Sequence, residues 1–416
     1  MSIGLNTALV LLTAVLGTQA WAQTSGPAGA PTSSSNPNTS PEAQQPPGSG
    51  QTTAPATPPS APPVPDTTFS STAIRAGGID FSGSIDGYYS FNNNHPQSGF
   101  NELYNFNDRT NQWDLNLAKL TVSRDPAPIG FRVDVGFGRA FEIEKTPHPD
   151  PEFYRFIEQS YVSVKPKGWK GFEADFGEFV TSAGAEVIES KDNWNYSRSL
   201  LFAWAIPYYH FGLRTSMPIG SSLSVGFQLV NGWNSIVDQY GNNLKTAGIT
   251  AAVTRKKFTW NHNYYVGPQF TGLSVLNQNI NRVRNLYDTT LLLTPNDKVN
   301  AYLNFDYGRQ NLALGSAHWI GFAGALHLQL TKRFAITPRA EYLNDVNGFA
   351  TGVKQHLHEA TVTGEWKIID GLLSRLEYRH DASNINFFDH GTVPSASKAQ
   401  STVTLGFIAY LPAKHQ

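Results

Sequence analysis

Between about residue 77 and residue 411, apolar and polar residues alternate along the chain. In the stretch 79–91, Ile79, Phe81 and Ile85 lie at odd positions, while Asp80 and Ser82 lie at even ones. Successive side chains of a β-strand point to opposite faces, so a period of two predicts strands with one apolar and one polar face. The same pattern recurs in 131–137, 209–214, 223–229, 299–307 and 372–381.

The connections between these stretches alternate between short and long. Short ones, rich in Pro, Gly, Asp and Lys, lie near 125–128, 165–168, 218–220, 255–257, 295–298, 331–333 and 370–371. Long polar ones lie near 92–112, 142–155, 178–207, 231–243, 267–282, 308–318, 345–356 and 382–399. This alternation predicts an all-β fold over 76–411: a transmembrane antiparallel β-barrel of about 16 strands, with short periplasmic turns and long extracellular loops.

A soluble β-sandwich or a repeat protein is the alternative architecture. A sandwich hides its apolar faces in one core of roughly 100 to 250 residues, so these strands would need several domains joined by linkers. No such linker follows Thr68. Tryptophans near strand ends also favour the membrane barrel, because interfacial aromatic residues form a girdle there. They are Trp113, Trp169, Trp204, Trp233, Trp260, Trp319 and Trp366.

The first 75 residues differ in composition from the rest. Residues 1–22 contain an apolar run and end with Ala20-Trp21-Ala22, which predicts a signal peptide cleaved after Ala22. Residues 23–75 are rich in Pro, Ser and Thr and predict a disordered linker, on the periplasmic side of the barrel. No apolar run reaches the about 20 residues of a transmembrane helix. Residues 412–416 form a short C-terminal tail.

Composition narrows the possible functions. Lys plus Arg number 31 and Asp plus Glu number 32, so a net charge of -1 gives no broad basic field for nucleic acid. The absence of Cys excludes disulfide frameworks, iron–sulfur clusters and thiol nucleophiles. A mean hydropathy of -0.31 excludes a polytopic helical membrane protein but is compatible with a barrel that is apolar on one face only.

Two places interrupt the alternation. The apolar phase changes between Leu117 and Leu120, which predicts a β-bulge near Ala118-Lys119. Pro338 lies in the middle of a predicted strand and lacks the N–H that the ladder needs, which predicts a bulge or a strand end there.

Several motifs between residues 177 and 234 carry a family resemblance. They are Gly-Glu-Phe at 177–179, Gly-Ala-Glu-Val-Ile-Glu at 184–189, Asn-Tyr-Ser-Arg-Ser at 195–199, Pro207 with His-Phe-Gly at 210–212, and Asn-Gly-Trp-Asn at 231–234. Gly-Ser-Ile-Asp-Gly-Tyr-Tyr at 83–89 and Gly-Phe-Arg at 130–132 fit as well. Together they resemble the OmpL-like β-barrel porin family of Gram-negative bacteria, over about 77–411. The resemblance implies an outer-membrane diffusion channel for small hydrophilic solutes.

Charged residues at polar positions of the strands are expected to line the pore. They are Arg132, Asp134, Arg214, Asp306, Arg339, Glu341, Glu365, Arg375, Glu377 and Arg379. In a water-filled pore such residues set the field that solutes meet. The alternative is that they pair with one another across strands and select nothing.

The connection 178–207 is the longest and the third of the long loops. In trimeric general porins the third extracellular loop bends into the barrel and narrows it, so this loop is the candidate constriction. Its charged residues are Glu178, Glu186, Glu189, Lys191, Asp192 and Arg198. Its acids are expected to face the wall arginines and give a transverse field. Alternatively, the loop packs against its neighbours around Trp194, Tyr196 and Trp204.

The sequence gives little support to catalysis or metal binding. His356 and His358 resemble a chelating pair, but no third ligand is fixed. Ser197 and Ser199 precede His210, but the Gly-x-Ser-x-Gly elbow of hydrolases is absent. We therefore expect no enzyme and no cofactor. A channel fits best, and the alternative is a non-channel barrel that acts as an adhesin or structural anchor through its extracellular loops.

The expected partners and faces follow from the barrel. The expected partners are small hydrophilic solutes, outer-membrane lipid and lipopolysaccharide, and the barrel-assembly machinery. Recognition of the last strand by this machinery is expected to rest on Phe407. Homo-oligomerisation is left open. Phe131, Val135, Phe227 and Leu303 are expected to face lipid. A Val135→Arg change should therefore cost far more than Asp134→Arg, which should be mild.

Overall fold

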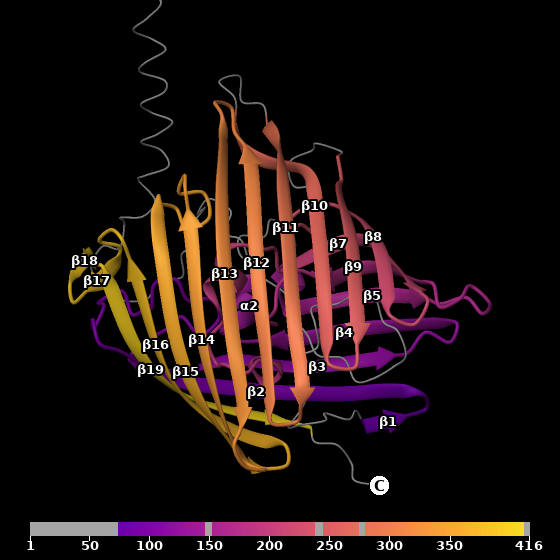
Figure 1. Ribbon diagram of the computed structural model, residues 1–416, viewed down its shortest axis with the longest axis horizontal. Helices are drawn as coiled ribbons and strands as arrows, with labels where there is room; N and C mark the ends of the chain where they lie inside the picture. The colour runs from indigo at the N-terminus through magenta and orange to yellow at the C-terminus, as the bar shows by residue number, and fades with distance from the viewer. Residues whose placement is uncertain (1–73, 146–151, 238–243, 274–278, 412–416) are drawn as a thin grey trace, which may run out of the picture.

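The computed structural model describes residues 74–145, 152–237, 244–273 and 279–411. The predicted signal peptide 1–22, nearly all of the linker 23–75 and the tail 412–416 lie outside this described part. Within it, 16 antiparallel strands form a closed barrel, which confirms the predicted fold (Figure 1). Each strand pairs with the strands before and after it, and the last strand closes the ring on the first, with Leu405 opposite Tyr89.

The barrel strands follow one another in chain order around the ring. They are β2 (Ile79–Asn92), β3 (Gln112–Arg124), β4 (Ile129–Phe137), β5 (Ile157–Val164), β6 (Glu173–Val180), β7 (Tyr209–Ile219), β8 (Leu223–Val230), β9 (Thr246–Arg255), β10 (Phe258–Leu273), β11 (Asn279–Asn296), β12 (Val299–Asn311), β13 (Ser316–Gln329), β14 (Phe334–Asp345), β15 (Gln355–Ile369), β16 (Leu372–Ser383) and β19 (Ala399–Tyr410).

The remaining elements are short. β1 (Ile74–Ala76) pairs with the start of β2, and β17 (Phe388–His390) with β18 (Val393–Ser397) forms a small hairpin before β19. The helices of the described residues are α2 (Arg139–Glu144), α3 (Leu200–Trp204), η1 (Glu152–Phe156) and η2 (Ser190–Asp192). None of these helices is long and apolar enough to cross a membrane.

Short turns lie at one rim and most long connections at the other, as predicted. Two predicted long loops are wrong, however. Strand β10 continues to Leu273 and β11 starts at Asn279, so most of 267–282 is strand; likewise β12 and β13 leave only 312–315 between them. Polar residues at both odd and even positions of the sequence made these strand ends resemble loops. The wall is uneven in height, since β10 and β11 have 16 and 18 residues while β5, β6 and β8 have 8 each.

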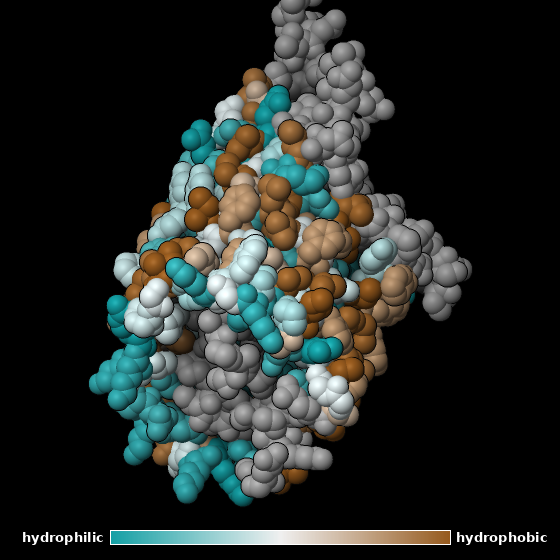
Figure 2. Space-filling view, turned by 90° about the vertical axis from the view of Figure 1, so that its right-hand side faces the viewer, coloured by the Kyte–Doolittle hydropathy of each residue, from teal (hydrophilic) through white to brown (hydrophobic). Residues whose placement is uncertain are grey.

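The two faces of the wall differ as the alternation predicted. Val135, Phe227 and Leu303 are exposed on the outside, and Figure 2 shows apolar side chains covering much of one side of the molecule. The tryptophan girdle is partly wrong. Trp113, Trp169, Trp260 and Trp366 are exposed, but Trp233 and Trp319 are buried and Trp204 packs against the interior. Nearness to a strand end does not decide which face a side chain takes.

The two predicted irregularities also need correction. The bulge of β3 lies at Asn116, because Asp86 pairs with Leu117 and Gly87 with Leu115, so Leu117 points inward instead of outward. Pro338 stands in register opposite Val362 without any bulge or strand end. Its side chain faces outward, and the strand continues through it to Asp345.

Candidate functional site

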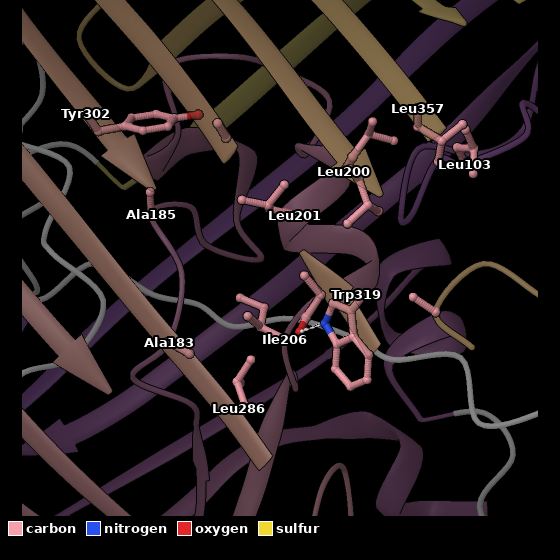
Figure 3. Packing of buried hydrophobic residues seen from close by; sticks show 14 of the residues in the cluster. Leu103, Ala183, Ala185, Leu200, Leu201, Ile206, Leu286, Tyr302, Trp319 and Leu357 are labelled. Atoms are coloured by element: carbon pink, nitrogen blue, oxygen red, sulfur yellow. Dashed lines mark hydrogen bonds between the residues drawn. The ribbon is translucent and has the colours of Figure 1, made fainter. Parts of the chain in front are cut away.

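The longest connection between neighbouring strands, residues 181–208, lies inside the barrel, and we call it the inner segment. Every residue of it is buried except Lys191, Asp192 and Trp204. The wall is a single layer of strands, so a loop buried to this extent lies within the ring. In Figure 3, Leu200, Leu201 and Ile206 of this segment lie among side chains from the strands.

Short-range hydrogen bonds give the inner segment its shape. The Asn193 side chain accepts from the Val187 N–H at 2.8 Å and donates to the Val187 carbonyl at 2.6 Å. These two bonds close a tight loop that contains η2. Ser199 caps α3, its hydroxyl accepting from the Phe202 N–H at 2.9 Å. An N-cap serine satisfies a backbone donor that the helix leaves free. The motif residues around 195–199 therefore fix a turn and a helix start.

Three arginines on one side of the barrel hold the inner segment by its backbone, and we call them the arginine wall: Arg339 on β14 with Arg375 and Arg379 on β16. Arg339 donates to the Ser197 carbonyl at 2.7 Å and Arg379 to the Arg198 carbonyl at 2.7 Å. Arg375 donates to the carbonyls of Ser190, Asn193 and Asn195. Hydrogen bonds from charged groups are about twice as strong as neutral ones, so these anchor the segment firmly.

Carboxylates of the same strands bind the N–H groups of the segment. Glu377 accepts from the N–H groups of Tyr196 and Ser197 at 2.6 and 2.9 Å, and Glu341 accepts from that of Leu201 at 3.2 Å. Buried backbone groups outside regular structure need such partners. The strands β14 and β16 thus supply both the donors and the acceptors that an irregular buried segment requires.

A lysine holds the inner segment from another part of the ring, on β3, which follows β16, β19 and β2 around the barrel. Lys119 on β3 forms ion pairs with Asp134 on β4, Glu158 on β5 and Glu189 of the segment, and we call these four residues the Lys119 cluster. A β-bulge at Glu158 turns it inward together with Gln159, because Asp134 pairs with Gln159 and the next pair is Val135 with Ile157. Bulges redirect side chains in this way.

A second buried charge group lies beside the Lys119 cluster. Lys145, which follows α2, pairs with Glu144 at 3.1 Å and with Glu178 at the end of β6. Burial raises the pKa of Glu144 to about 7; Lys145 opposes this shift, and the nearby Glu178 adds to it. The carboxyl therefore gains its charge near neutral pH.

Apolar side chains and inward glycines complete the fit of the segment. Trp319 on β13 donates its indole N–H to the Ala205 carbonyl at 3.0 Å (Figure 3). A Cβ at Gly406 would lie 2.3 Å from the Tyr196 ring, and one at Gly321 would lie 2.6 Å from Leu201. Glycine at these two wall positions makes room for large side chains of the segment.

The first long connection, 93–111, also folds inward and covers the inner segment. Leu103, Tyr104 and Phe106 are buried in it. Trp204 donates to the Leu103 carbonyl at 3.1 Å, and the Phe106 ring packs on that of Phe202 at 6.0 Å. Leu103 and Phe106 have positive φ of 65° and 71°, which bulky residues adopt only when packing holds them there.

The charged residues predicted for the constriction lie in different surroundings. Glu186 accepts from Arg339 at 2.8 Å and from the Tyr302 hydroxyl at 2.9 Å. Glu189 belongs to the Lys119 cluster, and Glu178 pairs with Lys145. Lys191 and Asp192 pair with each other. Arg198 is buried and donates to the Tyr196 carbonyl at 2.6 Å and the Ser190 hydroxyl at 2.9 Å, within its own segment.

The predicted wall residues all line the inner face, and most pair along their own wall. The pairs within the wall join Arg132 to Asp134 at 3.0 Å, Arg214 to Asp175 at 2.7 Å, Arg375 to Glu365 at 2.6 Å, Arg379 to Asp381 at 2.7 Å and Arg339 to Glu341 at 3.2 Å. Asp306 lies opposite Asp288 in the register of β11 and β12. Among the described residues, the expected ion pairing of loop acids with wall arginines therefore holds only for Glu186 and Arg339, because the other arginines pair with carboxylates of their own or of a neighbouring strand.

One protein-family model covers most of the chain. Residues 78–411 match the family model described as "Putative beta-barrel porin-2, OmpL-like". The chain belongs to this family. No curated protein sequence matches the chain.

Solved structures of other outer-membrane barrels share the fold of this family member. OmpT of Vibrio cholerae matches with a TM-score of 0.52 and 11% identity, covering 81% of this chain and 99% of that one. The channel DcaP of Acinetobacter baumannii gives 0.54 at 10% identity, covering 82% and 99%. An anion-selective porin of Comamonas acidovorans gives 0.53 at 9% identity, covering 80% and 99%. At these identities the likeness concerns the fold.

Sequence reasoning missed several residues of this porin's interior. Lys119 and Glu158 stand at or beside strand irregularities, where a plain alternation assigns the wrong face. Asp86, which accepts from the Tyr196 hydroxyl, and Tyr302 lie at regular inward positions. Their inward phase was readable from the alternation, but their partners in the inner segment were not.

The weak catalytic and metal motifs are dispersed in this structure. Ser199 caps α3, whereas the His210 ring contacts the Thr181 hydroxyl and the Gly232 carbonyl. His356 and His358 lie on the outer face of β15, with the Tyr342 hydroxyl bound to His356. Within the described ranges, no three residues of the types His, Cys, Asp and Glu are placed to hold a metal ion.

Proposed function

We propose that this family member is a passive diffusion channel for small hydrophilic solutes in the outer membrane, and that the inner segment is its constriction. The observation that carries the proposal is the anchoring of one segment by two separate groups of strands, β14 and β16 through the arginine wall and β3 to β5 through the Lys119 cluster. A segment that is fixed by both groups of strands narrows the passage and stays in place. Charged groups at its edges keep that passage polar.

The adhesin or anchor alternative has less support. It needs long loops that project outward as a binding surface, whereas 93–111 and the inner segment turn into the barrel. We also propose that residues 23–75 lie in the periplasm, that the barrel contacts lipopolysaccharide and the barrel-assembly machinery, and that it forms homo-oligomers. One solved form of the Vibrio protein is described as a trimer.

Swelling of proteoliposomes tests the channel. Purified protein should admit small sugars and exclude large ones, so that the swelling rate falls steeply with solute size. Heat-modifiable migration on a gel reports that the barrel is folded in the same sample. A folded barrel that admits no sugar of any size would contradict the proposal and favour the anchor.

A further inference from the structure

Charge is divided unequally between the inside and the outside of the barrel. Over the whole chain, 31 Lys and Arg almost balance 32 Asp and Glu. Among the described residues, however, 18 Asp and Glu side chains are buried, against 8 Lys and Arg side chains. In a wall of one layer, buried charged side chains lie on the inner side. The interior is therefore strongly acidic, and the exposed surface carries the balancing cations.

The buried cations do not neutralise this excess. Four of the eight, Lys119, Lys145, Arg339 and Arg379, already pair with more than one carboxylate. Lys119 has three, Arg339 pairs with Glu186, Glu341 and Glu359, and Lys145 has two. Several other carboxylates have only neutral partners. Asp288, for example, accepts from the amides of Asn263 and Asn304 at 2.7 and 2.9 Å.

Unpartnered oxygens are a second and independent sign of this excess. Oε1 of Glu158 and Oε2 of Glu189 are buried and accept no hydrogen bond. Each of these side chains is more than nine-tenths buried. A buried charged oxygen without a donor costs free energy, so these atoms favour a cation beside them. Both residues belong to the Lys119 cluster.

Shared protons do not remove the excess. Asp306 lies opposite Asp288, and Glu341 lies opposite Glu359. Two neighbouring carboxyls hold one proton between them, because like charges at short range disfavour double ionisation. Without the one acid of each pair that keeps the proton, the buried acids still outnumber the buried Lys and Arg by about two to one.

We infer that the channel passes cations in preference to anions, and that the carboxylates of the Lys119 cluster contribute most to this preference. This inference rests on the proposed diffusion function. Low-dielectric walls focus the field of the fixed charges, which concentrates cations inside and repels anions. The Lys119 cluster joins three carboxylates to one amine, Arg132 is a second cation on Asp134, and Glu189 brings one of the carboxylates from the inner segment itself. The excess charge thus lies at the proposed constriction.

Reversal potentials in planar bilayers test this inference. With a KCl gradient across the wild-type channel, we expect K⁺ to be favoured over Cl⁻ by about threefold or more. The Glu158→Gln, Glu189→Gln double variant should lower this permeability ratio by about twofold or more, because it removes two charges from one point. Asp297→Asn is the matched control, since Asp297 is exposed on a short turn. It should leave the ratio unchanged.

The outcomes separate this inference from the proposed function. A conducting channel that is unselective or favours Cl⁻ would overturn the cation preference and leave the diffusion function standing. An equal loss of selectivity in the control would overturn the role of the Lys119 cluster. A folded barrel without conductance would contradict the diffusion function. In that case calorimetric titration in detergent decides the charge preference: binding of spermidine but not citrate supports it, and the reverse overturns it.

Discussion

On strand β12, the outer and inner faces depend on different kinds of contact. Outside, Leu303 is 56% exposed and contributes through its apolar surface alone. Inside, Tyr302 donates to Glu186 of the inner segment, and Asn304 donates to Asp288 of the neighbouring strand β11. The outer position needs only the right polarity, whereas the inner position needs particular partners from elsewhere in the chain.

This contrast extends around the barrel and has an energetic consequence. An outer side chain is replaced at the cost of its transfer between lipid and water. An inner charged side chain leaves its partners buried and unpaired when it is removed, which costs more than the net worth of the pair. Substitutions on the two faces should therefore differ in size, in mechanism and in their effect on the inner segment.

The largest effect is expected when the arginine wall is broken. Arg339→Ala leaves Glu186, Glu341 and Glu359 without their shared cation and removes three further hydrogen bonds to Ser197 and Arg198 of the inner segment. We expect a loss of about 3 to 5 kcal/mol in the free energy of unfolding. Denaturant titration in lipid vesicles measures this loss. Arg333→Ala, at an exposed turn, is the control, and an equal loss in both variants would contradict the special role of the wall.

A smaller effect is expected from a charge on the lipid face. Val135→Arg should cost about 2 to 4 kcal/mol of unfolding free energy if the position lies near mid-bilayer, with Val135→Leu as the neutral control. A negligible effect of Val135→Arg would mean that β4 presents its other face to lipid. The same titration serves for both variants.

The neighbouring position changes an expectation drawn from sequence. Asp134→Arg was expected to be mild, but Asp134 is fully buried and pairs with Lys119 and Arg132. An arginine at position 134 would lie beside Lys119 and Arg132, so this variant should also lower the free energy of unfolding. Asp134→Asn separates the causes, since it removes the charge but keeps the hydrogen bond from Gln159 at 2.8 Å. It should cost less than Asp134→Arg.

The smallest expected effect concerns pH. Because the pKa of Glu144 is raised to about 7, this carboxyl is neutral at pH 6 and charged at pH 8. Its charge adds to the acidic interior, so cation preference should increase modestly between these values. Glu144→Gln should remove part of that increase, while Glu142→Gln, at the exposed side of α2, should not. Reversal potentials at both values provide the measurement, and an identical increase in all three proteins would exclude Glu144 as the cause.

The sequence predicted the barrel well because alternation is a local property. Sixteen strands, their order and the exposure of residues such as Val135 follow from it. The face of Trp319 also follows from the alternation, since Ile320 and Phe322 point outward and Trp319 has the opposite phase. Its position near a strand end instead suggested the membrane interface. Where a bulge shifts the phase, as at Asn116 and Glu158, local alternation fails.

The candidate site was predictable only in part. The segment 178–207 and its charges could be singled out, but the partners of those charges could not. Lys119 meets Glu189 across 70 positions, and Arg375 reaches carbonyls of 190–195 from β16. Such contacts depend on how the segment folds within the closed ring. An irregular loop has no periodicity from which that path could be deduced.

Single-channel conductance of a shortened inner segment tests the central claim most directly. A variant that lacks 183–198 loses the anchors to the arginine wall and to Lys119, and its folded state is checked by heat-modifiable migration. If the inner segment is the constriction, the conductance of this variant exceeds that of the wild-type barrel. An unchanged conductance in the folded variant would contradict the account.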